Sequence, residues 1–295
     1  MIDEMPIVFS SHGVPLSGCL LRSGDHSERR PIVLVAGSWL TVKEQMPLLY
    51  ARRLAEAGYD AFIFDFTGFG ESHGELRQVE MPSRKIDDLR AAVGFLRTIG
   101  FVDPERIGAV AVCGSAQNVL AALAQEVPIR TFASVAGWYH DPPSVAPFYG
   151  GTDGVALRLA RARAATMKYL STRELSLVPA YDDGNDRAGM FFPLAYYARQ
   201  DRGAIPAWKN QMSEMTWSHW LTFDGLAAAK GVSAPCVFVH ADDCVFPDHV
   251  KQVHANVKGP KELVWVTGNQ IDFYDQPEQV NAAMEAIDSW FKRTL

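Results

Sequence analysis

The chain has 295 residues, of which 48% are hydrophobic and 21% charged. These are the proportions of an ordinary globular protein and exclude a disordered or fibrous chain. The formal net charge of −6 leaves no surplus of basic residues to neutralise a phosphate backbone, so we expect no nucleic-acid partner. No apolar stretch approaches the ~20 residues that cross a bilayer, and the acidic start differs from a signal peptide. We therefore expect a cytoplasmic protein with no membrane partner.

The sequence carries no pattern typical of a metal or cofactor site. The four cysteines lie apart without CxxC spacing, which predicts free thiols in a reducing compartment. The eight histidines also lack the spacing of metal ligands. The glycine-rich loop 68–72 is too short for a dinucleotide fingerprint and lacks its third glycine. We expect no metal and no cofactor.

Short apolar runs alternate along the chain with longer amphipathic segments. This alternation is typical of parallel strands joined by crossover helices. Buried strands are predicted over 31–36, 61–65, 106–112, 131–135, 235–240 and 262–266. Helices are predicted over 44–57, 85–99, from 113 onward, from about 248, and over 277–292. The fold class is therefore α/β, with a doubly wound, mostly parallel sheet.

Residues 138–231 interrupt this alternation. The stretch contains no convincing strand and is rich in aromatic residues, Arg, Met and Pro. We predict that it is a helical cap inserted into a core formed by residues 1–137 and 232–295. Its aromatic residues fit two interpretations, the wall of an apolar pocket for a bulky acyl substrate or a small core of the cap itself. They are Tyr196, Tyr197, Trp208, Trp217 and Trp220.

A candidate nucleophile follows the predicted strand 106–112. A nucleophile elbow is a strained strand-to-helix turn that needs small residues two positions before and after the nucleophile. The run 111–115 (AVCGS) satisfies this pattern with Cys113 at its centre. Centring the pattern on Ser115 puts Gln117 where a small residue belongs. We prefer Cys113 and keep Ser115 as the alternative.

The predicted turn also implies an electrostatic environment. A helix N-terminus can lower a thiol pKa from ~8.5 into the range ~3.5–7.5, so Cys113 could ionise without a histidine. The alternative is that Cys113 is only a small buried hydrophobic residue. The backbone N–H groups of Gly114 and Trp39 match the two donors of an oxyanion hole on such a fold.

Several segments resemble one enzyme branch. They are AGSW at 36–39, FDF at 64–66 with GFGES at 68–72, RIG at 106–108 leading to Cys113, WSHWLTFD at 217–224 and IDFYD at 271–275. Together they resemble the dienelactone-hydrolase-like α/β-hydrolases that include fungal polyketide transferases. The resemblance covers nearly the whole chain. It implies the α/β-hydrolase fold with a cap, and activity on an ester, thioester or related carbonyl substrate.

The resemblance also locates an acid and a base position. Asp243, four residues before Pro247, is similar to the acid of the family, with Asp242 as the alternative. A loop carboxylate that only caps the following helix is the other interpretation. Family members typically carry histidine before the 271–275 run, where this chain has Gln270. A carboxamide cannot take up a proton near neutral pH, so the usual proton transfer is interrupted.

Three hypotheses follow from Gln270. A histidine from elsewhere, His140 or His219, supplies the base, since a base is recognised by geometry. Alternatively, Cys113 reacts as a self-ionised thiolate while Gln270 orients the substrate, which favours transfer, or a lyase or isomerase step, over hydrolysis. In the third hypothesis the chain is a catalytically silent binder. The expected partner in each case is a small molecule, and the sequence leaves a homodimer open.

Overall fold

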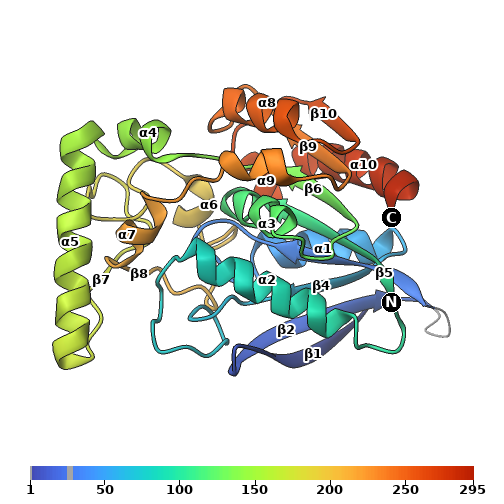
Figure 1. The fold of residues 1–295 in the computed structure, drawn as a ribbon, viewed down its shortest axis with the longest axis horizontal. Helices are drawn as coiled ribbons and strands as arrows, with labels where there is room; N and C mark the ends of the chain where they lie inside the picture. The colour runs from blue at the N-terminus through green and yellow to red at the C-terminus, as the bar shows by residue number, and fades with distance from the viewer. Residues whose placement is uncertain (1, 25–28) are drawn as a thin grey trace.

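The computed structural model describes residues 2–24 and 29–295 and shows an eight-stranded sheet with helices on both faces (Figure 1). The strand order is β1-β2-β4-β3-β5-β6-β9-β10. The strands are β1 (Ile2–Ser11), β2 (Val14–Ser23), β3 (Arg30–Ala36), β4 (Asp60–Phe64), β5 (Val102–Val112), β6 (Thr131–Val135), β9 (Cys236–His240) and β10 (Lys261–Trp265). All pairs from β4 to β10 are parallel, which confirms the predicted doubly wound sheet.

The first two strands form a hairpin that the sequence analysis did not predict. They pair antiparallel through the turn His12-Gly13, where both residues have positive φ, +48° and +81°. Two positive φ values match the right-handed twist of the flanking strands. β1 alternates exposed and partly buried positions instead of forming a continuous apolar run, so it lacks the signal of the buried strands.

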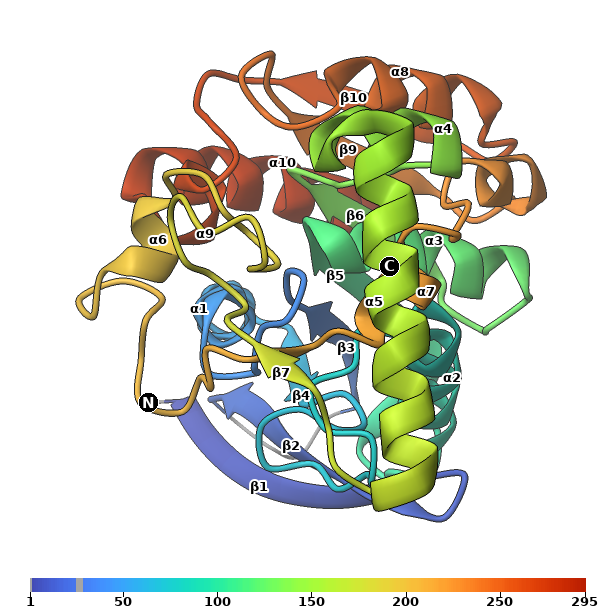
Figure 2. The same ribbon diagram turned by 90° about the vertical axis from the view of Figure 1, so that its left-hand side faces the viewer.

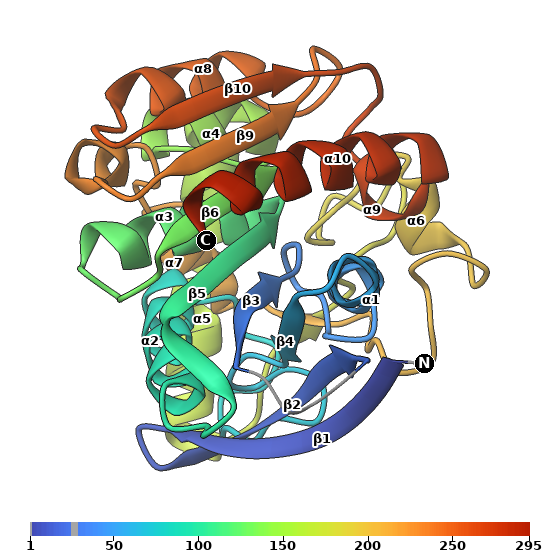
Figure 3. The same cartoon turned by 90° about the vertical axis from the view of Figure 1, so that its right-hand side faces the viewer.

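Helices cover the two faces of the sheet in pairs (Figure 3). α1 (Met46–Glu56) and α10 (Pro277–Thr294) contact each other on one face, and α2 (Pro82–Leu96) packs against α3 (Gly114–Ala124) on the other. α8 (Pro247–Asn256) packs on β9 and β10, and the short α9 (Asp272–Asp275) contacts α10. Proline in the first turn starts α2, α8 and α10, because the N–H that it lacks has no helical partner there.

The core lies along the central strands. All residues of β4, β6 and β9 are buried, as expected for strands covered by helices on both faces. The predicted strands and helices are all present, with ends shifted by a few residues. In the part of the chain that the structure describes, no helix is both long and apolar enough to cross a membrane.

Residues 138–231 lie outside the large sheet. They form α4 (Pro142–Val145), η1 (Ala146–Tyr149), α5 (Gly151–Thr172), α6 (Ala195–Ala198), α7 (Thr216–Trp220) and η2 (Ala227–Gly231). The long helix α5 stands at one side of the molecule in Figure 1 and crosses in front of the central strands in Figure 2. The expectation of no strand here is wrong, because β7 (Leu177–Val178) pairs with β8 (Met212–Ser213). Strands of two residues leave no alternating pattern in a sequence.

The buried strand β6 provides a test of the core. Phe132 has 0% exposure and meets Phe238 of β9 edge to face, with ring centroids 6.5 Å apart. We expect Phe132→Ala to lower the free energy of unfolding by about 3–5 kcal/mol, because it leaves a cavity in a close-packed interior. Urea unfolding measures this change. The control is Val8→Ala at a 72% exposed position, where a shift of less than about 0.5 kcal/mol is expected; equal shifts would contradict the prediction.

Candidate active site

Cys113 lies in a strained turn between β5 and α3. Its φ and ψ are 55° and −122°, a left-handed conformation that side-chain-bearing residues rarely adopt. Such strain persists only where the surroundings hold it, and it concentrates at functional sites. The following residue is small because a Cβ on Gly114 would lie 3.2 Å from the backbone nitrogen of Trp39. The turn therefore brings the Gly114 and Trp39 backbones together beside the thiol.

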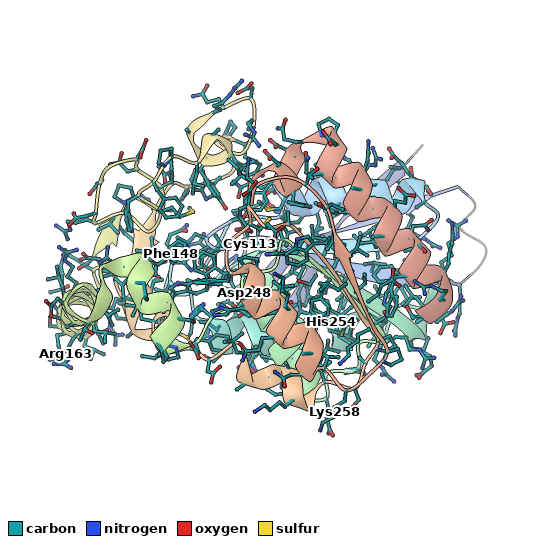
Figure 4. All side chains as sticks on the ribbon, turned by 90° about the horizontal axis from the view of Figure 1, so that it is seen from above. Cys113, Phe148, Arg163, Asp248, His254 and Lys258 are labelled. Carbon is teal, nitrogen blue, oxygen red and sulfur yellow. The ribbon has the colours of Figure 1, made fainter. Side chains whose placement is uncertain are left out.

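A cavity of about 420 Å³ opens at Cys113, between the sheet and the cap. Figure 4 shows Cys113 near the boundary between these two parts, with Phe148 on the cap side. The cavity walls are mainly apolar, and their aromatic residues are Trp39, Trp138, Tyr149, Phe192, Tyr197, Trp220 and Tyr274. Two of the five cap aromatics singled out from the sequence, Tyr197 and Trp220, line the cavity. The other three do not line the cavity and are buried in the main hydrophobic core, where they contact residues of the sheet domain, so the interpretation of a separate cap core does not hold for them.

The cavity is almost uncharged. Among its described lining residues, Asp243 alone carries a charged side chain. Asp243 is exposed, and its backbone pairs with that of Asn269 in an isolated bridge. In the described part of the chain no hydrogen bond joins its carboxylate to Gln270. The neighbouring candidate, Asp242, is exposed and does not line the cavity.

Gln270 lines the cavity at the position where the family resemblance places a histidine. Its Nε2 donates to the carbonyl of Ala136, 2.7 Å away, and lies 3.5 Å from the hydroxyl of Tyr274. Its Oε1 accepts the backbone N–H of Val245 at 3.1 Å. The carboxamide thus ties the end of β6 to the loop after β9. Both polar atoms of the side chain therefore make hydrogen bonds to the backbone beside the cavity.

The thiol of Cys113 is surrounded by neutral hydrogen-bonding groups. Burial raises its pKa above the ordinary value of 9.0, although hydrogen bonds from Ser38, Tyr274, the Gly114 backbone and Gln270 lower it. The expectation of a lowered thiol pKa is therefore wrong. The loss of water around the sulfur outweighs the neighbouring hydrogen-bond donors. At neutral pH the thiol is protonated.

Three hydroxyl groups form a chain beside the thiol. The hydroxyl of Tyr197 donates to Ser38 Oγ at 3.1 Å, and Ser38 Oγ lies 3.2 Å from the hydroxyl of Tyr274. Burial raises the pKa of both tyrosines well above the ordinary value, so they stay neutral. Sequence reasoning assigned no role to Ser38 or Tyr274, although both lie in the motifs that carry the resemblance. Hydroxyl groups have no spacing signature comparable to that of a triad.

Neither alternative base reaches the cavity. His140 is fully buried, its Nδ1 accepts from Trp138 Nε1 at 2.7 Å, and its Nε2 donates to the Trp220 carbonyl at 2.8 Å. Burial lowers the pKa of His140 to about 4, which keeps the ring neutral. His140 therefore supports two tryptophans of the cavity wall. His219 lies in α7 and does not line the cavity, and burial lowers its pKa too.

The alternative nucleophile Ser115 also lies away from the cavity. Its side chain has 0% exposure in the first turn of α3, and it is not among the lining residues. The small-x-nucleophile-x-small pattern centred on Cys113 thus agrees with the observed position of the turn.

The loop that carries the Trp39 N–H is held by buried charges. Leu40 has a φ of +59°, and its N–H donates to Glu80 Oε2 at 3.2 Å. Glu80 in turn pairs with Lys85 at 2.7 Å, where both side chains are buried. The Leu40 carbonyl accepts from Trp208 Nε1 at 2.8 Å. Donors fixed in this way need no reorganisation when charge develops on a substrate oxygen.

One acidic cluster has the arrangement of metal ligands. Oxygen atoms of Glu44, Asp65 and Glu71 lie within 4.8 Å of one another. The ammonium group of Lys43 contacts all three, at 2.6, 2.8 and 2.7 Å. Burial opposes the charge of Lys43, but the adjacent carboxylates raise its pKa. The lysine itself is the cation of this cluster, which anchors the loop after Leu40.

The chain is similar in sequence and in fold to known proteins. A model of the alpha/beta hydrolase family matches residues 32–283. Polyketide transferase claH from Penicillium crustosum is 24% identical, over 96% of this chain and 94% of the relative. The structure of the alpha/beta hydrolase GrgF from Penicillium sp. sh18 has a TM-score of 0.82 and 20% identity, covering 100% of this chain and 99% of that one. Hypothetical protein PA2218 from Pseudomonas aeruginosa gives a TM-score of 0.84 and 24% identity, over 100% and 94%. The predicted resemblance is confirmed.

The raised thiol pKa has a direct chemical consequence. Only the thiolate is alkylated, so the rate at which iodoacetamide modifies Cys113 should rise about tenfold per pH unit from pH 7 to 9 without a plateau. Peptide mapping by mass spectrometry measures the rate at each cysteine. Cys236, which has 0% exposure in β9, reports unfolding and should stay unmodified. If the alkylation rate of Cys113 reached a plateau below pH 8, the raised pKa would be contradicted and the hypothesis of a self-ionised thiolate would be supported.

Proposed function

Because the chain belongs to the alpha/beta hydrolase family, we propose that it is an enzyme that accepts an acyl group on Cys113 and transfers it to a second small molecule. The observation that carries the proposal is Gln270, a group unable to carry a proton, at the base position beside a protonated thiol. Water is a poor nucleophile without a general base. Transfer to a more reactive acceptor is therefore favoured over hydrolysis.

Both steps of a transfer balance without a titrating base. In the first, a bond forms between Cys113 Sγ and the acyl carbon, the bond to the leaving oxygen or sulfur breaks, and the thiol proton leaves with that group. In the second, the acceptor attacks the acyl carbon and its proton returns to Sγ. The N–H groups of Gly114 and Trp39 would stabilise the oxyanion in each step. No charged intermediate has to be stored on an imidazole.

The cavity indicates the class of substrate. About 420 Å³ is within the range of small-molecule sites, and its walls are aromatic and uncharged except for Asp243. A neutral ester or thioester with a bulky apolar acyl group fits this lining better than a charged one. The similarity to a polyketide transferase supports the same class of substrate.

A non-catalytic binder is the second candidate. It is favoured by the high thiol pKa and by the hydrogen bonds of Gln270, which go to Val245 and Ala136 and, among the described residues, not to Asp243. Such a protein would bind the ligand under the cap and form no covalent adduct. Covalent labelling separates the two candidates.

Acylation gives the first test. Mixing the protein with a p-nitrophenyl ester should release a burst of about one p-nitrophenolate per chain and add one acyl group, detectable by intact mass. Cys113→Ala should lose both signals. Cys244→Ala removes another buried cysteine that does not line the cavity and should keep them. Ligand binding with no burst and no added mass would establish the binder instead.

Restoring a base gives the second test. Gln270→His places an imidazole at the cavity near Asp243, so we expect the steady hydrolysis that follows the burst to increase at least tenfold, since general bases contribute ~10²–10⁴ in rate. Gln270→Asn cannot carry a proton and serves as the control. If the histidine variant folds and shows a burst but hydrolyses no faster, the missing base does not limit reaction with water.

A further inference from the structure

We propose that Tyr274 is a catalytic residue and that the hydroxyl groups of Tyr274, Ser38 and Tyr197 form a relay that moves the thiol proton of Cys113 to and from the reacting groups. The inference rests on the acyl-transfer function proposed above. It assigns the proton handling that Gln270 cannot perform to three side chains outside the usual triad.

The geometry of the chain carries the inference. Cys113, Ser38 and Tyr274 line the same cavity, and the two hydroxyl groups are close enough to the thiol to lower its pKa, so the relay begins beside the reacting sulfur. Ser38 Oγ lies 3.2 Å from Tyr274 and 3.1 Å from Tyr197, so it joins the two phenols. All three hydroxyl-bearing residues line the cavity. A proton that leaves the thiol can therefore be delivered to a group bound in the same cavity.

Three separate elements bring these groups together. Ser38 follows β3, Tyr197 lies in α6 of the cap, and Tyr274 lies in α9 after the base position. Their residues are 3%, 3% and 2% exposed, so bulk water does not compete for the hydrogen bonds. The cap thus supplies one end of the relay.

Hydroxyl groups can pass a proton without ionising. Each hydroxyl has one donor and two acceptor sites, so it can receive a proton from one neighbour while it gives its own to the next. A concerted shift of this kind leaves every tyrosine neutral before and after the step. Gln270 lies 3.5 Å from the Tyr274 hydroxyl and directs an N–H toward it, which fixes one acceptor site of that oxygen.

The other titratable groups near the cavity do not serve this purpose. His140 uses both ring nitrogens to hold Trp138 and the Trp220 carbonyl. Asp243 is exposed, and within the described residues its carboxylate accepts no hydrogen bond that would connect it to the thiol. The three hydroxyl groups, by contrast, are joined by hydrogen bonds and line the same cavity as the thiol.

In the acylation step the relay makes and breaks bonds as follows. Sγ bonds to the acyl carbon while its proton moves to Ser38 Oγ, which accepts the Tyr197 hydroxyl and passes its own proton to the hydroxyl oxygen of Tyr274. The Tyr274 proton moves to the leaving oxygen or sulfur as its bond to the acyl carbon breaks. The sum is a thiol plus an ester or thioester giving an enzyme thioester plus an alcohol or thiol. Transfer to the acceptor runs the same path in reverse.

Leaving-group dependence distinguishes the relay from a structural role. A p-nitrophenolate ion leaves without a proton at neutral pH, whereas an alkyl thiol requires one. In single-turnover experiments, Tyr274→Phe and Ser38→Ala should slow acylation by an N-acetylcysteamine thioester about 10²-fold, and acylation by the matching p-nitrophenyl ester about tenfold or less. The double variant should be no slower than the worse single variant, because both act on one path.

The fold itself offers a matched control. The hydroxyl of Tyr139 donates to Ser134 Oγ at 2.8 Å, in a buried tyrosine–serine pair that does not line the cavity. Tyr139→Phe should therefore leave both acylation rates unchanged. Thermal unfolding of each variant confirms that it is folded at the assay temperature.

The outcomes separate the relay from the proposed function. Equal slowing with both leaving groups, or no slowing, while the wild-type burst depends on Cys113 overturns the relay and leaves acyl transfer intact. Absence of any burst from the wild-type protein overturns the proposed function and the relay with it. If Tyr274→Phe is unfolded, Ser38→Ala and Tyr197→Phe carry the same comparison.

Discussion

The strained turn at Cys113 is the constraint on which the site depends. A side chain at φ 55° is held only because the surrounding backbone leaves it no alternative, and that backbone includes Gly114 packed against Trp39. The turn presents Cys113 to the cavity and brings the Gly114 backbone against that of Trp39. A larger residue at 114 would push against the Trp39 backbone, so one steric requirement positions the proposed nucleophile and the proposed oxyanion donors.

Buried ion pairs hold the loop that carries Trp39. The Glu80–Lys85 pair fixes Leu40, and the Lys43–Asp65 pair fixes the residues that follow it. Taking such pairs out of water is costly, and replacing them with apolar residues is often neutral for stability. Here each carboxylate also accepts a backbone N–H of the loop that carries Trp39. Their contribution is therefore to hold a loop in a left-handed conformation that apolar packing alone would not specify.

The sequence predicted the parts of this structure that have a period or a steric rule. Buried strands such as β6 and β9 are continuous apolar runs, and the turn at Cys113 follows from small residues at fixed spacing. The hairpin β1–β2 and the two-residue strands of the cap were missed because they are half exposed or too short. The thiol pKa was predicted in the wrong direction, because the sequence shows the helix N-terminus but not the depth of burial. Ser38, Tyr197 and Tyr274 meet only through tertiary packing of three distant segments.

Gln270, at the position where the family resemblance expects a histidine, limits what the site can do with charge. An imidazole near neutral pH stores a proton, and a neighbouring carboxylate then stabilises the cation. The oxygen of Gln270 instead accepts the Val245 N–H, and its nitrogen donates to the Ala136 carbonyl. The side chain therefore holds two loops together and does not ionise. The cavity around it has phenols, a serine hydroxyl and indole rings in its walls, and Asp243 is the one charged side chain among its described lining residues. In such a site a proton moves only together with the bonds that form and break. This arrangement favours reactions in which each partner brings its own proton.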